Sequence, residues 1–174
     1  MLVDYKNKSH NFARRLVGSS DSGKDSFVHK LRGRPNRCPT HGVTAITVNV
    51  GGRDVTLLNT PAVDSFVNGK AVSVCDVRDM IRNRLQKLRR DSLGGILYFH
   101  NTDGKQTAPP NVDSFGEICE ATDIVLVATG ERLFELPELE TTIWREAMSR
   151  GAKAFPFINT KESAEEAVAV ITDN

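Results

Sequence analysis

The stretch that decides the fold is Gly18-Ser19-Ser20-Asp21-Ser22-Gly23-Lys24-Asp25. Its two glycines and its lysine have the spacing of a phosphate-binding loop (P-loop), whose last position normally carries Ser or Thr. In such a loop, backbone N–H groups converge on phosphate oxygens, the lysine reaches the terminal phosphates, and the next helix points its positive dipole end at them. Asp25 stands where a magnesium-binding hydroxyl is expected, so the single departure from the motif concerns the metal.

The sequence on each side of the loop agrees with this interpretation. Residues 12–17 are typical of a short strand, and residues 24–31 carry apolar side chains at helical spacing, as the following helix requires. Arg14 and Arg15 count against it, because a central strand that is covered on both faces is expected to be almost entirely apolar. The alternative is a Gly/Ser-rich turn that binds nothing.

Length and composition indicate a single globular domain at 12–174, preceded by an N-terminal extension at 1–11. The chain has 174 residues, of which 39% are hydrophobic, and its formal net charge of +1 argues against a general polyanion-binding surface. Its three cysteines have no metal-binding or redox spacing, and residues 1–11 are polar and unlike a signal peptide. We find no apolar segment of bilayer length and expect a cytoplasmic protein with no membrane partner.

Strand-like and helix-like segments alternate along the chain. The runs 43–50 and 54–58 flank Gly51-Gly52 and are expected to pair antiparallel. Further strands are expected at 95–100, 124–128 and 154–158, and further helices at 76–90, 114–120, 138–150 and 162–171. This order predicts a three-layer α/β fold whose sheet is mostly parallel, with one antiparallel hairpin strand.

The motifs, taken in order, resemble a known family. The loop is followed by Thr40-His41-Gly42-Val43 and by Leu57-Leu58-Asn59-Thr60-Pro61-Ala62-Val63-Asp64, which is similar to the Asp-Thr-Pro-Gly region of translation-factor-class GTPases. More narrowly, residues 95–100 and 151–164 look like fungal AIG1/septin-like G domain-containing proteins. The resemblance covers roughly residues 12–171 and implies a GTPase-like P-loop NTPase fold.

The resemblance also implies an altered magnesium site. Asp25 places a carboxylate beside the phosphates, and two unit charges about 4 Å apart repel by roughly 4 kcal/mol at an effective dielectric near 20. Direct ligation of the metal by Asp25, with the Ser26 hydroxyl nearby, would offset this repulsion; the open alternative is weak binding without metal. Asn59 replaces the family's Asp, and Ala62 replaces its Gly. Thr40 holds the place of the switch-loop threonine, with an ordinary threonine in a surface turn as the equal alternative.

Hydrolysis and base recognition are both expected to be weakened. Val63 stands where many GTPases have a glutamine that orients water. His41 and Asp64 are the candidates for a substitute base, although a solvated loop residue is the favoured interpretation of each. Arg132 stands where the family has its base-binding carboxylate, so discrimination of guanine should be lost unless Glu131 replaces that acid.

We therefore expect a degenerate GTPase-like domain that binds a nucleoside di- or triphosphate, with slow or absent hydrolysis and weakened guanine specificity. The alternatives are an active NTP hydrolase with a rearranged metal site and a pseudo-GTPase scaffold that binds no nucleotide. The expected catalytic residues are Lys24, Thr40 and His41, and the expected Mg²⁺ ligands are Asp25 and Thr40. A guanine or adenine nucleotide is expected to contact Gly18, Asp21, Ser22, Gly23, Lys24, Asp25, Ser26, Thr129, Arg132, Asn159 and Thr160. A second copy or another protein would pair through the nucleotide face, and the basic helix 78–90 is interpreted as a solvated face, not a nucleic-acid surface.

Overall fold

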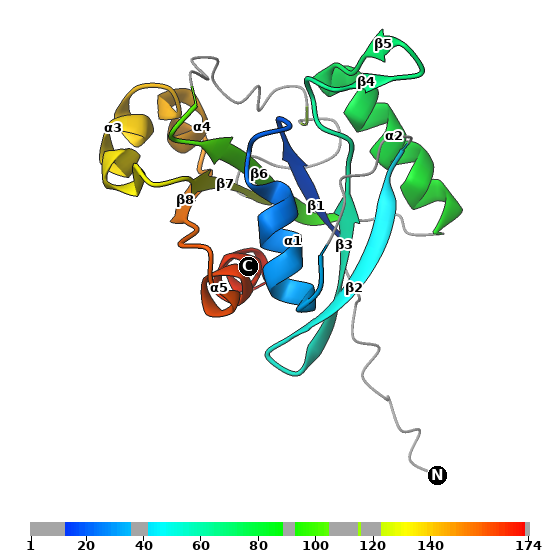
Figure 1. The fold of residues 1–174 in the computed structure, drawn as a ribbon, viewed down its shortest axis with the longest axis horizontal. Coiled ribbons are helices and arrows are strands. Elements are labelled where there is room, and N and C mark those ends of the chain that lie inside the picture. Colours follow the sequence, from blue (N-terminus) through cyan, green and yellow to red (C-terminus); the bar gives the residue numbers. More distant parts are fainter. Residues whose placement is uncertain (1–12, 36–41, 89–92, 105–114, 116–122, 173–174) are drawn as a thin grey trace.

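The computed structural model describes residues 13–35, 42–88, 93–104, 115 and 123–172. Across these residues a six-stranded sheet has the order β2-β3-β1-β6-β7-β8 (Figure 1). Its strands are β1 (Ala13–Gly18), β2 (Thr44–Val50), β3 (Arg53–Asn59), β6 (Leu93–Asn101), β7 (Ile124–Thr129) and β8 (Lys153–Pro156). β2 runs antiparallel to β3, and the other neighbouring pairs are parallel. The predicted sheet, with its one antiparallel hairpin strand, is confirmed.

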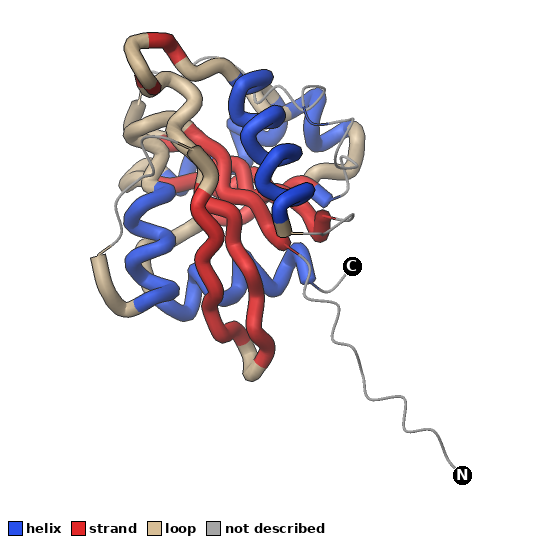
Figure 2. Tube along the Cα trace, turned by 90° about the vertical axis from the view of Figure 1, so that its right-hand side faces the viewer, coloured by secondary structure: helices blue, strands red, loops and turns tan. Residues whose placement is uncertain are grey.

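Helices cover both faces of the sheet (Figure 2). The α-helices within the described ranges are α1 (Lys24–Arg32), α2 (Val74–Lys87), α3 (Leu136–Thr141), α4 (Arg145–Ser149) and α5 (Lys161–Thr172). α1 and α5 contribute to one core, and α2, α3 and α4 contribute to the other. The architecture therefore has the three layers that the alternating segments predict.

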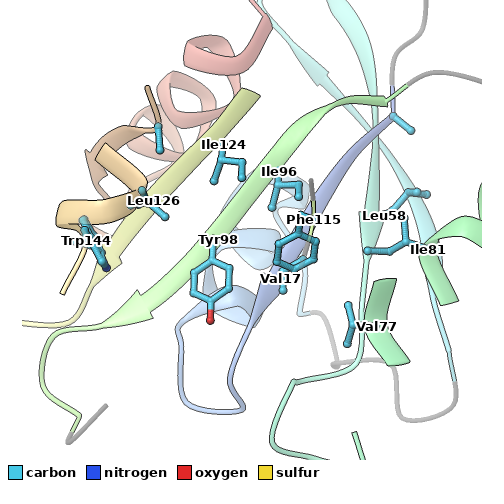
Figure 3. Packing of buried hydrophobic residues seen from close by; sticks show 14 of the residues in the cluster. Val17, Leu58, Val77, Ile81, Ile96, Tyr98, Phe115, Ile124, Leu126 and Trp144 are labelled. Atoms are coloured by element: carbon cyan, nitrogen blue, oxygen red, sulfur yellow. The ribbon is translucent and has the colours of Figure 1, made fainter. Parts of the chain in front are cut away.

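Successive residues of the central strands point into these two cores. In β1, Leu16 belongs to the core under α1 and α5, whereas Val17 belongs to the core under α2 (Figure 3). Trp144 is fully buried in the second core. Because both faces are covered, the strands are apolar almost throughout. Arg14 and Arg15 are the exceptions in β1. Both are buried, since this strand lies inside the sheet between β3 and β6.

The prediction of one continuous helix at 138–150 is wrong, because the structure has two short helices there. α3 ends at Thr141, and α4 begins at Arg145. The hydroxyl of Thr142 donates to the Glu138 carbonyl at 2.6 Å, and the hydroxyl of Thr141 lies 3.1 Å from the same oxygen. Threonine hydroxyls that bond to the preceding turn compete with the helical backbone, and the β-branch adds crowding there. These two adjacent threonines explain the interruption.

A small hairpin that the sequence analysis missed connects β3 to α2. It consists of β4 (Phe66–Val67) and β5 (Lys70–Ala71), which pair antiparallel. Asn68 and Gly69 both have positive φ, 51° and 78°, as the tight mirror-image hairpin turn requires. The predicted helix at 114–120 and the extension at 1–11 lie outside the described residues, apart from Phe115. Among the described helices, none has the length and apolar character to cross a bilayer.

Candidate functional site

The P-loop joins β1 to α1, and its two glycines are required by the geometry. A Cβ on Gly18 would lie 2.5 Å from Oγ of Ser22, whose side chain is fully buried. Gly23 caps the N-terminus of α1 with φ 77°, a left-handed conformation, and a Cβ there would lie 3.0 Å from the Thr129 side chain. Only glycine meets these steric and conformational demands without strain.

The ends of the neighbouring strands hold the loop in shape. The Thr129 hydroxyl, at the end of β7, donates to the carbonyl of Ser22 at 2.9 Å. Nδ2 of Asn101, at the end of β6, donates to the carbonyl of Asp21 at 3.0 Å. Within the loop, Oγ of Ser22 donates to the carbonyl of Ser19 at 2.7 Å. These bonds fix the backbone around the positive end of the α1 dipole, which is the arrangement that an anion-binding loop needs.

Lys24 is directed into the protein at the end of β3. Its side chain is 2% exposed, and Nζ donates to the Thr60 carbonyl at 2.6 Å. Thr60 is itself fixed, because its hydroxyl donates to the Leu16 carbonyl at 2.7 Å. The ammonium group is therefore positioned between the P-loop and the segment that follows β3.

The segment after β3 also contacts the outer side of the P-loop. The backbone N–H of Val63 donates to the Gly18 carbonyl at 3.1 Å. The Asp64 carboxylate accepts from the backbone N–H of Ser20 at 2.8 Å and from the Ser20 hydroxyl at 3.0 Å. The Asp64 carboxylate thus already accepts hydrogen bonds from two donors of the loop.

On the other side of the loop lies a cavity of about 450 Å³. It is bounded by the P-loop and α1, by the carboxyl ends of β6 and β7, and by the segment after β8. Its lining residues are Asp21, Gly23, Ser26, Asn101, Asp103, Thr129, Gly130, Glu131, Leu133, Phe157, Ile158 and Asn159. Glu131 lines this cavity and Arg132 does not; the Arg132 guanidinium pairs with the carboxylate of Glu135.

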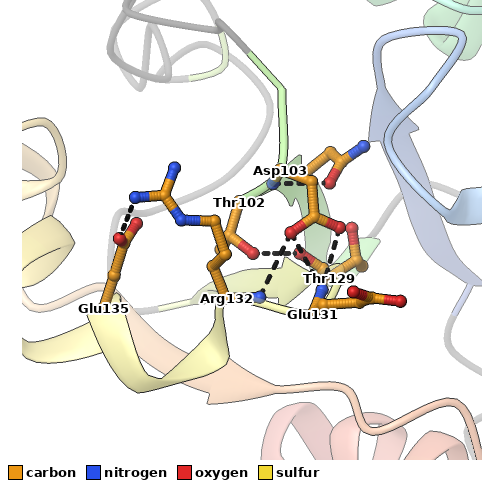
Figure 4. A network of polar contacts seen from close by, with 7 residues as sticks. Thr102, Asp103, Thr129, Glu131, Arg132 and Glu135 are labelled. Carbon is orange, nitrogen blue, oxygen red and sulfur yellow. Dashed lines mark hydrogen bonds and ion pairs between the residues drawn. The ribbon is translucent and has the colours of Figure 1, made fainter.

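Asp103 holds the backbone at Glu131 and Arg132, next to the cavity (Figure 4). Its carboxylate accepts from the backbone N–H of Glu131 at 2.8 Å and from that of Arg132 at 3.1 Å. Its own N–H donates to Oδ1 of Asn101 at 2.9 Å. The sequence analysis missed Asn101 and Asp103. Their signal was available, since polar residues directly after a buried parallel strand lie at the sheet edge where ligands bind.

The remaining predicted residues are distributed unevenly around the site. Ser26 donates its hydroxyl to Oδ1 of Asn159 at 2.9 Å, so these two residues meet at the cavity rim. The Thr160 hydroxyl instead accepts from the Ser163 backbone N–H at 3.1 Å, at the start of α5, and Thr160 does not line the cavity. Asp25 lies in the first turn of α1 and is half-buried. Thr40 and His41 lie outside the described residues.

Oxygen donors for a hard cation are present near the loop, although no group of three His, Cys, Asp or Glu residues gathers within the described ranges. Asn59, at the end of β3, is fully buried, and neither polar atom of its amide has a partner among the residues described. A buried unpaired polar group costs about 1–3 kcal/mol, so a ligand or water is expected to satisfy it. Mg²⁺ at phosphate sites needs only one or two protein oxygens. Asp25, in the first turn of α1, and Asn59, at the end of β3, are therefore the candidate oxygen donors for a magnesium ion bound together with phosphates.

His100 lies in β6, directly before Asn101, and its pKa is perturbed. Burial lowers its pKa from the usual 6.5, while the Asp21 carboxylate acts in the opposite direction. The ring packs edge-on against Trp144 with 5.6 Å between ring centroids. We interpret His100 as a neutral packing residue of the core.

Solved structures with the same fold include G domains of P-loop GTPases. Toc33 from Arabidopsis thaliana in complex with Mg²⁺ and GMPPNP matches with a TM-score of 0.61 at 14% identity, over 94% of this chain and 85% of that chain. A dimerisation-deficient Toc33 variant matches with a TM-score of 0.60 at 16% identity, over 96% and 87% of the two chains. The FeoB G-domain from Methanococcus jannaschii matches with a TM-score of 0.60 at 12% identity, over 94% and 98%.

Sequence comparison adds nothing to this structural likeness. No protein-family model matches the chain, and no curated protein matches it. The resemblances to the translation-factor class and to fungal G domain-containing proteins therefore stay predictions. The shared structure places the chain in the α/β fold of P-loop G domains.

Proposed function

We propose that this chain binds a nucleoside di- or triphosphate, with the phosphates in the P-loop and the nucleoside in the 450 Å³ cavity. The observation that carries the proposal is the continuity of the two parts: Asp21, Gly23 and Ser26 belong to the loop or the start of α1 and also line the cavity. The Toc33 structures, which are bound to Mg²⁺ with GMPPNP or GDP, support a nucleotide and a metal as ligands of this fold.

The phosphate end depends on Lys24. Its ammonium bonds to the neutral Thr60 carbonyl at 2.6 Å, and phosphate oxygens would offer charged acceptors in exchange. The bond to Thr60 carries charge on its donor alone, whereas a bond to phosphate pairs opposite charges, so this exchange favours the ligand. A magnesium ion bound there would neutralise phosphate charge. Its protein ligands would be the Asp25 carboxylate and the side-chain oxygen Oδ1 of Asn59, with Thr40 as a further candidate.

The base end favours guanine only weakly. The family's carboxylate position holds Arg132, which pairs with Glu135 away from the cavity. Glu131 brings a carboxylate to the cavity wall, where it can accept hydrogen bonds from the donors on the guanine edge. Its side chain is exposed to solvent, which weakens the contribution of any such bond to specificity.

Turnover is proposed to be slow or absent. Val63 carries no group that can orient water, and the carboxylate of the adjacent Asp64 is engaged by Ser20. A P-loop nucleotide hydrolase depends on a side chain that positions the attacking water. Binding without efficient hydrolysis is thus the function that this arrangement supports best.

The test is a titration with fluorescent guanine and adenine nucleotides, with and without Mg²⁺, accompanied by measurement of phosphate release. Lys24→Ala should weaken binding about a hundredfold, since it removes charge-assisted bonds of about 1.5–3 kcal/mol each. Lys87→Ala, at the exposed end of α2, is the matched control and should leave affinity unchanged. Absence of binding to every nucleotide would refute the proposal in favour of the scaffold alternative, and rapid phosphate release abolished by Lys24→Ala would establish an active hydrolase. Sedimentation of the native chain with and without nucleotide tests a second copy as partner, a possibility supported by the existence of a dimerisation-deficient variant of Toc33.

A further inference from the structure

The P-loop has two different surroundings in space, which we call its two ends. At one end, Asp21 and Gly23 border the cavity proposed for the nucleoside. At the other end, the loop meets the segment after β3, where Nζ of Lys24 bonds to the Thr60 carbonyl. Because the lysine of such a loop reaches the β- and γ-phosphates, this second end is where the terminal phosphate of a bound nucleotide would lie.

An internal anion already occupies this second end. Asp64 accepts from the Ser20 backbone N–H at 2.8 Å and from the Ser20 hydroxyl at 3.0 Å, one bond to each carboxylate oxygen. The N–H of Val63 donates to the Gly18 carbonyl at 3.1 Å, which anchors the residue just before Asp64 to the same loop. The contact therefore has two oxygens on two donors and a backbone bond beside it.

We propose that Asp64 is a specificity-determining residue that stands in for the terminal phosphate, so that the site selects nucleoside diphosphates over triphosphates. The inference rests on the proposed nucleotide-binding function. A diphosphate would leave the Asp64–Ser20 contact in place. A third phosphate would bring further negative charge against the carboxylate and would have to displace it from both donors.

The same displacement would reach the β4–β5 hairpin. Ser65, next to Asp64, donates its hydroxyl to the Ala62 carbonyl at 2.7 Å and accepts the Val72 N–H at 2.8 Å, closing the base of the hairpin. Movement of Asp64 away from Ser20 strains these bonds, since they belong to the next residue. Faster amide hydrogen exchange at Val72 is therefore expected with a bound triphosphate and not with a diphosphate.

The experiment measures the affinities of GDP and GMPPNP by calorimetry for the native chain and three variants. The native chain should prefer GDP about tenfold, which is the effect of a single hydrogen bond to a charged group at the lower end of its range, because solvent screens the exposed Asp64 carboxylate and weakens its two bonds. Asp64→Ala should raise the affinity for GMPPNP by about the same factor and change that for GDP by less than about twofold. Ser20→Ala removes one of the two donors and should give a smaller gain for GMPPNP. Asp79→Ala, an exposed acidic residue on α2, is the control for net charge and should change neither affinity.

The outcomes separate this inference from the proposed function. If the native chain binds both nucleotides and Asp64→Ala shifts both affinities equally, or neither, the inference is refuted while nucleotide binding stands. If the native chain and Asp64→Ala bind neither GDP nor GMPPNP, and neither ADP nor AMPPNP in the same titration, both proposals are refuted. Binding of GMPPNP that appears only in Asp64→Ala would support the inference, because it would show that the carboxylate excludes the triphosphate.

Discussion

Substituting alanine for the two glycines that flank α1 tests the geometry of the loop. Gly23 and Gly33 cap the two ends of α1 with φ 77° and 65°, so alanine at either position carries the same left-handed strain. That strain is about 1–2 kcal/mol, and the lower entropy of the unfolded chain returns about 0.4–1 kcal/mol of it. The surroundings differ, because a Cβ on Gly33 meets nothing within 4 Å, whereas one on Gly23 lies 3.0 Å from three atoms of Thr129.

The expected losses of unfolding free energy therefore differ. Gly33→Ala should cost about 0.5–1 kcal/mol, and Gly23→Ala should cost about 2–4 kcal/mol once the crowding of a packed site is added. Urea unfolding of the two variants, compared at equal m-values, measures the difference. Gly23→Ala should also weaken nucleotide binding while Gly33→Ala leaves it intact. Equal destabilisation by the two substitutions would refute the claim that Thr129 packs against the loop as described.

Three further predictions concern the cavity, the core and α2. Glu131→Gln should reduce the preference for guanine over adenine nucleotides by about fivefold, because it removes the charge of an exposed acceptor; paired titrations of the two nucleotides measure the ratio. The lowered pKa of His100 means that the unfolded chain binds the proton first, so stability is retained above pH 6.5 and is lost as the pH falls through the folded pKa. His100→Phe should reduce the fall in urea midpoint between about pH 7.5 and about pH 5, two values that bracket the usual pKa of 6.5. An unchanged dependence of the urea midpoint on pH would contradict this account. Ser73→Ala removes the side chain that accepts from Asp76 N–H in the capping box of α2 and should lower the unfolding free energy by about 1 kcal/mol. A loss below about 0.3 kcal/mol would show that α2 does not depend on this cap.

The parts of the fold that the sequence predicts are those with a local physical cause. The loop spacing, the Gly51-Gly52 turn and the apolar strands each specify their own conformation, and the structure has the sheet that they imply. The turn at Asn68-Gly69 carried a comparable hairpin signal that was overlooked. The break after α3 follows from hydroxyl bonds to Glu138, which helical periodicity does not reveal.

The cavity could be predicted only in part, because its wall is assembled across strands. The carboxylate of Asp103 reaches the backbone of Glu131, which lies 28 residues further along the chain, and this contact orients the loop after β7. An interpretation based on the spacing from Thr129 alone puts Arg132 in the place of the base-binding acid. The structure instead has Glu131 on the cavity wall and pairs Arg132 with Glu135. Such a choice between adjacent side chains depends on tertiary hydrogen bonds and leaves no pattern in the local sequence.

Three departures from the pattern of the GTPases that the motifs resemble, at Asn59, Ala62 and Val63, fall on one side of the site. Gly18, Gly23 and Thr129 determine the shape of the loop, and all three fulfil steric or hydrogen-bonding demands that the structure makes explicit. The departures at Asn59 and Val63 lie instead along the segment that would act on the terminal phosphate. A loop can bind anions through its backbone and dipole without that segment, whereas hydrolysis and switching require it. The physical consequence is that affinity for a diphosphate should survive changes that abolish turnover. The contact between Asp64 and Ser20 remains in place as long as no terminal phosphate is bound.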